Sequence, residues 1–261
     1  FAFYTMYVTS RMALANLFSG PDMWRTLRFR RSWARKLLPT LGVKMHTTGA
    51  APDFPCLLVA NHRSYLDPAI LAHDVLGYAV AKAEVANWPV IGWGARVAGV
   101  IFLQRESRDS RKVALTGIAE KIREGFPVIL FAEGTTHTGE KTIPFKSGSF
   151  KLAAKEGIPI VPAAIEFQSP EDYWVDDATF LPHLFGRLKV REKHAFVRYG
   201  PTFSGDDPEV WMDHWSEELV TLWHGLLEQC HAMGAAVLDR CDFPAFAQFC
   251  WERSSRMSPA V

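Results

Sequence analysis

The sequence lacks several features that would place it in a common protein class. Its four cysteines form no CxxC pair, and none of its nine histidines stands in a metal-binding spacing. Four cysteines in 261 residues are typical of a reduced, cytoplasmic protein and not of a disulfide framework. The formal net charge is only +1, which argues against nucleic acid as the main partner, because such proteins usually carry a marked basic excess.

Long hydrophobic runs are also missing. No uninterrupted apolar run reaches the roughly 18 to 20 residues that a membrane-spanning helix needs. The opening FAFYTMYVTSRMALANLF is nevertheless apolar apart from Arg11 and a few hydroxyl side chains. We expect either the end of a longer hydrophobic segment or a helix lying on a bilayer. A signal peptide fits less well, because the basic residue follows the apolar part.

Charge is distributed unevenly near the start of the chain. Residues 25–36, RTLRFRRSWARK, hold six basic residues and no acidic one, interleaved with Leu27, Phe29 and Trp33. An anionic membrane surface attracts such a segment by about 1 kcal/mol per cation. The alternative is a helix that packs its apolar side on the domain and leaves its charges in water. Residues 1–40 are therefore predicted to be an N-terminal, membrane-associating helical segment.

From residue 55 onward, short apolar runs alternate with stretches of helical character. The predicted strands are 56–60, 78–81, 100–103, 128–132, 158–165 and 194–200, and the predicted helices are about 67–75, 88–98, 110–124 and 147–156. This alternation indicates an α/β fold with a largely parallel sheet. Most strand runs are continuously apolar, so helices are expected to cover both faces. The run at 194–200 alternates instead, which predicts a place nearer the edge.

One domain with helical attachments at both ends is the predicted organisation. After the segment 1–40, we expect the main domain over 41–235 and a C-terminal tail over 236–261, with both end segments on the membrane side. Asp207 and Pro208 predict the start of a long helix late in the main domain.

The stretch VANHRSYLDPAI, residues 59–70, places four residues between His62 and Asp67 at the end of a predicted strand. In a structural interpretation, Asp67 caps a helix that starts near Pro68, and His62 is a loop residue. In a functional one, the motif lies where α/β sheets bind ligands, at the carboxyl end of a strand. A neutral imidazole can take a proton from a hydroxyl, and a carboxylate can fix its tautomer. The segment must then curl as a turn, because residues five apart in a regular helix point away from each other.

Three further blocks follow this motif in order. They are KAEVANWPVIGWGARVAGVIFLQR (82–105), LFAEGTTHTG (130–139), and IPFKSG (143–148) leading to GIPIVPAAI (157–165). Together with NHRSYLD, they resemble the four sequence blocks of the glycerolipid acyltransferase family, whose best-known members are the 1-acylglycerol-3-phosphate acyltransferases. The resemblance covers roughly residues 43–205, and four blocks in the right order and spacing are a specific signal.

The resemblance implies roles for particular residues. His62 is then the general base that deprotonates the acceptor hydroxyl, and Asp67 is its orienting partner. Arg105 binds the phosphate of the acceptor, a task suited to the forked donors of a guanidinium, and Lys146 lies near the reacting groups. The other substrate-binding positions that the blocks imply are Asn61, Ser64, Lys82, Glu133, Gly134, Thr135, Thr136 and Gly148. No metal or tightly bound cofactor is implied; the acyl donor is acyl-CoA or an acyl carrier protein.

Taken one at a time, several of these residues fit simpler structural roles. Arg105 heads a charged run and alone resembles a solvated surface residue. Glu133 and Gly134 could form an ordinary turn after a strand, and Lys82 could pair with Glu84 at a strand end. The joint occurrence of all of them is what favours a site.

The third block departs from the family pattern at a position that bears on the acceptor. It commonly reads Glu-Gly-Thr-Arg, and that arginine is a phosphate ligand; here Thr136 stands in its place, followed by His137. Losing one guanidinium removes a charge-assisted bond worth about 1.5 to 3 kcal/mol. The family as a whole implies lysophosphatidate as the acceptor and phosphatidate as the product. Glu-Gly-Thr-Thr instead resembles members that acylate other lyso-lipids, such as lysophospholipids or the lyso form of an ornithine lipid.

Two other classes compete with this interpretation. A lipid hydrolase would use Ser64 as a nucleophile beside His62, although no GxSxG elbow surrounds it. In a non-catalytic lipid-binding module, the contact between His62 and Asp67 would have only a structural role. We favour an O-acyltransferase at the cytoplasmic face of a membrane, whose partners are the bilayer surface, a lyso-lipid acceptor and the acyl donor.

Overall fold

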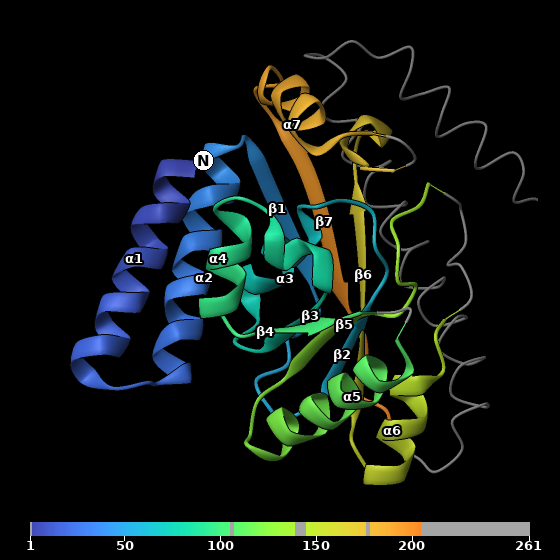
Figure 1. Ribbon diagram of the computed structural model, residues 1–261. Helices are drawn as coiled ribbons and strands as arrows, with labels where there is room; N and C mark the ends of the chain where they lie inside the picture. Colours follow the sequence, from blue (N-terminus) through green and yellow to red (C-terminus); the bar gives the residue numbers. More distant parts are fainter. Residues whose placement is uncertain (1, 105–106, 139–144, 176–177, 205–261) are drawn as a thin grey trace, which may run out of the picture.

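A seven-stranded sheet forms the centre of the protein, with the strand order β1-β7-β6-β2-β5-β3-β4 (Figure 1). The computed structural model describes residues 2–104, 107–138, 145–175 and 178–204. The strands are β1 (Val43–Thr48), β2 (Leu57–Ala60), β3 (Tyr78–Lys82), β4 (Val100–Leu103), β5 (Val128–Phe131), β6 (Ile160–Phe167) and β7 (Lys193–Tyr199). All neighbouring pairs are parallel except β6 with β7. The predicted α/β domain with a largely parallel sheet is confirmed.

Helices cover both faces of this sheet. They are α1 (Ala2–Ser19), α2 (Met23–Thr40), α3 (Asp67–Asp74), α4 (Ile91–Val97), α5 (Arg108–Arg123), α6 (Gly148–Glu156) and α7 (Phe180–Leu188), with short 3-10 segments at Ala83–Asn87 and Pro170–Asp172. Side chains of a strand alternate between faces. Leu57 and Val59 of β2 accordingly join the core under α5 and α6, whereas Leu58 and Ala60 join the core under α2 and α3.

Two elements were not predicted from the sequence. Strand β1 is an edge strand whose residues VKMHTT are mostly half-buried or exposed, so it lacks the apolar run that marks the inner strands. Helix α7 contains a proline and exposes Leu181, Phe185 and Leu188, so its pattern does not resemble a helix packed on a core. Because β1 occupies the edge, β7 lies one strand in from it, and six of its seven residues are buried.

Helices α1 and α2 form an antiparallel hairpin at one side of the sheet (Figure 1). Part of the basic segment is structural, because Arg30 is buried and donates hydrogen bonds to the carbonyls of Ala98 (3.0 Å) and Gly77. Other cations of the segment, such as Arg28, remain exposed. No helix within the described ranges combines the length and the apolar character needed to cross a bilayer. The predicted helix from Asp207 and the predicted tail lie outside the described residues.

Candidate active site

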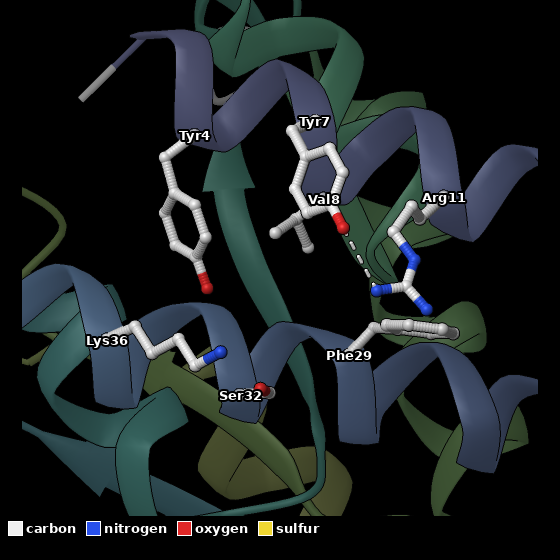
Figure 2. Close-up of a pocket in the computed structure, with 7 residues that line it drawn as sticks. All are labelled: Tyr4, Tyr7, Val8, Arg11, Phe29, Ser32 and Lys36. Carbon is white, nitrogen blue, oxygen red and sulfur yellow. Dashed lines mark hydrogen bonds between the residues drawn. The ribbon is translucent and has the colours of Figure 1, made fainter.

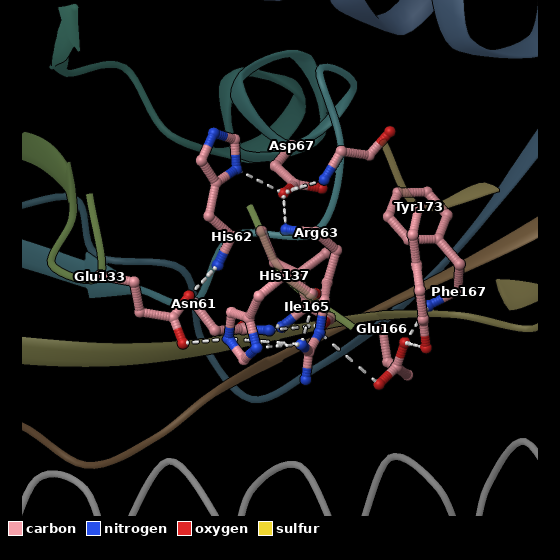
Figure 3. Close-up of polar contacts among 11 residues, drawn as sticks. Asn61, His62, Arg63, Asp67, Glu133, His137, Ile165, Glu166, Phe167 and Tyr173 are labelled. Carbon is pink, nitrogen blue, oxygen red and sulfur yellow. Dashed lines mark hydrogen bonds and ion pairs between the residues drawn. The ribbon is translucent and has the colours of Figure 1, made fainter. Parts of the chain in front are cut away.

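The loop that follows β2 brings His62 and Asp67 together. Nδ1 of His62 lies 2.8 Å from Oδ2 of Asp67, which confirms the predicted contact (Figure 3). The same carboxylate oxygen accepts hydrogen bonds from the backbone N–H groups of Arg63 (2.6 Å) and Ser64 (2.8 Å). Residues 61–66 therefore fold as a turn around the carboxylate, and three donors stabilise its negative charge.

The capping interpretation of Asp67 is wrong in the structure. Leu66 is the N-cap residue of α3, and no side chain caps this helix. Asp67 is itself the first residue of α3, fully buried, and its hydrogen bonds run back into the preceding loop. Pro68 lies in the first turn of α3, where the missing N–H of a proline costs no intrahelical bond.

The imidazole of His62 is held on two sides and open on a third. Its ring stacks on Phe131, the last residue of β5, with 4.2 Å between ring centroids. About 19% of its side chain is exposed, whereas the side chain of Asp67 is 0% exposed. Because Nδ1 faces the carboxylate, Nε2 points away from Asp67 and is available to a substrate hydroxyl (Figure 3). This arrangement is suited to general-base chemistry.

Glu133 holds residues 61–66, the candidate catalytic loop, from the neighbouring strand. In the register of β2 and β5, Ala60 pairs with Phe131, so the residues that follow each strand lie side by side. One oxygen of Glu133 accepts a hydrogen bond from the backbone N–H of His62 (2.7 Å), and the other lies 2.7 Å from Nε2 of His137. Both oxygens are engaged inside the protein, so Glu133 positions the loop, and its predicted contact with the acceptor stays a prediction.

Arg63 is a residue of this site that the sequence did not single out. Although charged, it is 1% exposed, and its Nη1 donates a hydrogen bond to the carbonyl of His137 (2.8 Å). Its Nε lies 4.0 Å from Glu166 of β6, which also accepts a hydrogen bond from the hydroxyl of Tyr173 (2.5 Å). Only its place inside the motif pointed to it, because a single sequence does not reveal that an arginine is buried.

Asn61 and Ser64 are both buried, and their substrate-binding roles stay predictions. The side-chain amide of Asn61 donates to the carbonyl of Ile165 (2.9 Å) and accepts from its N–H (2.7 Å), so it joins the end of β2 to β6. Ser64 is fully buried, and its hydroxyl has no hydrogen-bond partner among the described residues. A hydroxyl without contact to His62 is not an activated nucleophile, which removes the basis of the hydrolase alternative.

The remaining predicted residues that the structure describes end β3 or follow β5, at the carboxyl edge of the sheet. Lys82 ends β3 and is exposed, with its ammonium 3.4 Å from Glu84, as expected for an ion pair at a strand end. Lys146 is exposed, and its backbone N–H donates to the carbonyl of Ala132 (3.1 Å), which directly follows β5. Thr135 and Gly148 are exposed, and Gly134 and Thr136 are half-buried. Arg105 lies outside the described residues.

An aromatic cluster borders the catalytic loop and was not predicted. Tyr65 makes edge-on contacts with Trp174, Phe180 of α7 and His183, with ring centroids 5.9, 5.0 and 5.5 Å away. Trp88 contacts Trp174 and Phe180. Burial, with a smaller contribution from the negative charge of Asp172, raises the pKa of Tyr65 to about 12. The cluster gives the catalytic loop an apolar border.

Comparisons with known proteins agree with this geometry. Residues 42–166 match the family described as Acyltransferase. The chain is 34% identical to a lyso-ornithine lipid O-acyltransferase of Pseudomonas aeruginosa over 171 residues, which are 64% of this chain and 66% of that relative. It is 30% identical to the corresponding protein of Rhodobacter capsulatus over 214 residues, or 78% of this chain and 77% of that relative.

A further relative and a solved structure point the same way. The 1-acyl-sn-glycerol-3-phosphate acyltransferase of Neisseria meningitidis is 30% identical over 135 residues, covering 51% of this chain and 53% of its own. The crystal structure of the 1-acyl-sn-glycerophosphate acyltransferase of Thermotoga maritima has the same fold, with a TM-score of 0.59 and 21% identity over 87% of this chain and 95% of that one. The chain thus belongs to the glycerolipid acyltransferase family.

Proposed function

We propose that this acyltransferase moves a fatty acyl chain from a thioester donor, acyl-CoA or an acyl carrier protein, to the free hydroxyl of a lyso-lipid. The observation that carries the proposal is the contact of 2.8 Å between His62 and a buried Asp67 at the carboxyl edge of β2. A partly exposed imidazole with a carboxylate behind it is the arrangement that general-base catalysis requires.

The proposed reaction proceeds without an acyl-enzyme. Nε2 of His62 takes the proton of the acceptor hydroxyl while the hydroxyl oxygen attacks the carbonyl carbon of the thioester. The carbon–sulfur bond then breaks, and the leaving thiolate takes the proton back from the imidazolium. Asp67 stabilises the imidazolium between the two proton transfers. Since the thioester supplies its own leaving group, the reaction needs no metal or tightly bound cofactor.

We propose that the aromatic cluster receives the hydrocarbon part of a substrate. Tyr65 lies three residues beyond His62, and its contacts with Trp174 and Phe180 form an apolar wall beside the loop. Aromatic side chains bury large apolar areas, so such a wall suits a fatty chain better than a polar headgroup. Lys146, on the rim beyond β5, would supply positive charge for the oxygen that becomes negative during attack.

For the acceptor, we propose a lyso-ornithine lipid. Thr136 replaces the arginine that binds phosphate in the family pattern, and His137 beside it turns toward Glu133 (2.7 Å). Residues 132–138 of this turn therefore supply no guanidinium of their own to a phosphomonoester. The names of the Pseudomonas and Rhodobacter relatives support the same acceptor. Lysophosphatidate is the second candidate, favoured by Arg105 in the second block and by the Neisseria relative.

The protein is further proposed to work at the cytoplasmic face of a membrane, where acyl-CoA and acyl carrier protein occur. Helix α1 turns Phe3, Leu17 and Phe18 to the surface, with exposures of 90%, 76% and 81%. Large apolar side chains gathered on one exposed helix face mark an interaction surface, and a lipid enzyme has a bilayer beside it. The exposed cations of α2 would meet its anionic headgroups.

An acceptor panel tests the proposal. The full chain is incubated with acyl-CoA, or separately with acyl carrier protein, and with lyso-ornithine lipid, lysophosphatidate or lysophosphatidylcholine. Released thiol and diacyl product are measured, and His62→Ala protein serves as the blank. We expect the highest kcat/KM with lyso-ornithine lipid. Thiol release that is the same with and without acceptor contradicts a transferase, and a preference for lysophosphatidate selects the second candidate.

A further inference from the structure

A crevice of about 120 Å³ lies between the two helices of the N-terminal hairpin (Figure 2). Helix α1 contributes Tyr4, Tyr7, Val8 and Arg11, and α2 contributes Phe29, Ser32 and Lys36. None of these residues belongs to the catalytic loop or to its polar network. The crevice is therefore a feature of the hairpin that the acyl-transfer chemistry does not use.

The crevice presents hydrogen-bond donors and positive charge without an acidic side chain. Figure 2 shows the hydroxyls of Tyr4 and Tyr7 and the ammonium of Lys36 directed into the space between the helices. The guanidinium of Arg11 donates to the hydroxyl of Tyr7 (3.2 Å) and lies 5.8 Å from the ring centroid of Phe29. Burial, followed by the neighbouring Tyr7, raises the pKa of Tyr4, so its phenol stays protonated as a donor.

The surrounding hairpin leaves this positive charge unbalanced. Between residues 2 and 40, Asp22 is the one acidic residue, and its carboxylate accepts a hydrogen bond from the backbone N–H of Arg25 (3.1 Å) as the cap of α2. Among the described residues, neither Arg11 nor Lys36 takes part in an ion pair. Donors and cations that converge on one space, with two tyrosines and a serine, suit the oxygens of a phosphate.

The position of the crevice on α1 indicates where that phosphate comes from. One residue turns a helix by about 100°, so residues 4, 8 and 11 lie beside the stripe made by residues 3, 14 and 17. That stripe consists of the exposed apolar side chains Phe3, Leu14 and Leu17, and Tyr7 lies at its border with the crevice. An apolar stripe next to a cationic crevice matches the order of a bilayer, where acyl chains lie beneath phosphates.

We propose that this crevice binds the phosphate of an anionic phospholipid of the bilayer, at a site separate from the acyl-transfer centre. The inference rests on the membrane association in the proposed function, and it adds a defined headgroup site to a surface that would otherwise attract lipid only by its overall charge. The phospholipid is a docking ligand here and undergoes no reaction.

Vesicle binding of the full chain tests this site. Binding constants are measured by flotation with phosphatidylcholine vesicles that contain or lack phosphatidylglycerol. The decisive variant is Tyr4→Phe/Ser32→Ala, which removes two hydroxyl donors without changing charge. We expect it to bind anionic vesicles at least about fivefold more weakly than wild type, since each lost hydrogen bond is worth a few-fold in affinity. Arg11→Gln/Lys36→Gln is expected to lose at least about tenfold more than the charge-matched control Arg28→Gln/Arg31→Gln.

The outcomes distinguish a headgroup site from attraction by overall charge. If the hydroxyl variant binds like wild type and the two charge variants lose affinity equally, diffuse attraction accounts for the binding and the inference is overturned. Competition by inorganic phosphate at constant ionic strength distinguishes a free anion from a lipid. Vesicle binding that persists in millimolar phosphate supports the lipid. If millimolar phosphate occupies the crevice and prevents vesicle binding, the free anion is its ligand, and a phospholipid ligand is contradicted. If wild type binds neither vesicle, membrane association fails, and this inference with it. Acyl transfer to a short-chain, monomeric lyso-lipid, where no bilayer is needed, is expected to be unchanged in every variant.

Discussion

One oxygen of Glu133 accepts a hydrogen bond from the backbone N–H of His62 at 2.7 Å, so the turn after β5 holds the proposed general base, which follows β2. The second oxygen of the same carboxylate lies 2.7 Å from Nε2 of His137, and Arg63 secures the carbonyl of His137 from the other side (2.8 Å). The turn after β5 therefore acts on the imidazole through its backbone, and the position of His62 depends on residues that need not touch the substrate.

Glu133→Ala is expected to lower kcat about 100-fold while the KM values of donor and acceptor stay within about twofold, because a displacement of the base near 1 Å has an effect of that size. Glu120→Ala, which truncates an exposed glutamate of α5 outside the predicted site, serves as the control. Steady-state kinetics with both substrates checks the prediction. A raised acceptor KM with unchanged kcat would show instead that Glu133 binds the acceptor directly.

Asp67→Asn is expected to reduce kcat by roughly 10⁴-fold with little loss of stability. An asparagine oxygen can still accept the backbone N–H bonds of Arg63 and Ser64, so the loop keeps its shape. The same oxygen then faces Nδ1 of His62, but the neutral amide lacks the negative charge that stabilises the imidazolium formed during proton transfer. Kinetics and thermal unfolding of the same preparation check this. A variant that keeps its activity and loses only stability would make the carboxylate structural.

Asn61→Ala is expected to destabilise the fold by about 2 to 4 kcal/mol, because it leaves the buried N–H and carbonyl of Ile165 without their partners. Asn87→Ala, at an exposed position, provides a matched control that should change stability little. The free energy of unfolding in urea is the measurement. Equal stabilities of the two variants would mean that the bonds between Asn61 and Ile165 do not hold β2 to β6.

Stability is expected to fall as the pH drops below about 6.5, with a contribution from His46 on β1. Burial, and then the neighbouring His194 and Lys44, lower the pKa of His46 from 6.5. The unfolded chain therefore takes up a proton on this side chain before the folded protein does. The stabilisation is complete above the unfolded pKa and is lost as the pH falls through it toward the folded value. In His46→Gln, the midpoint temperature of thermal unfolding should change less between pH 7 and pH 5 than it does in wild type. An equal change in both proteins would assign the pH dependence of stability to other groups.

The sequence was sufficient for the inner strands and for the contact between His62 and Asp67, and the reasons are physical. A strand that is buried on both faces, such as Leu57–Ala60, needs apolar side chains at every position, so it appears in the sequence as a continuous apolar run. The spacing of His62 and Asp67 fits a turn at the end of such a strand. Strand β1 was missed because an edge strand needs few apolar residues. The backbone contacts of Asn61 and Glu133 were not predicted, because a polar residue in a motif can serve the backbone as well as a ligand, and only the fold decides which partner it reaches.

His62 is proposed to be the base that deprotonates the acceptor, and this role is measured by the rate of acyl transfer by His62→Ala at saturating donor and lyso-lipid. We expect a loss of at least about 100-fold in kcat, with wild-type thermal stability and unchanged binding of the acyl donor. Transfer within a few-fold of wild type by the folded variant would contradict it.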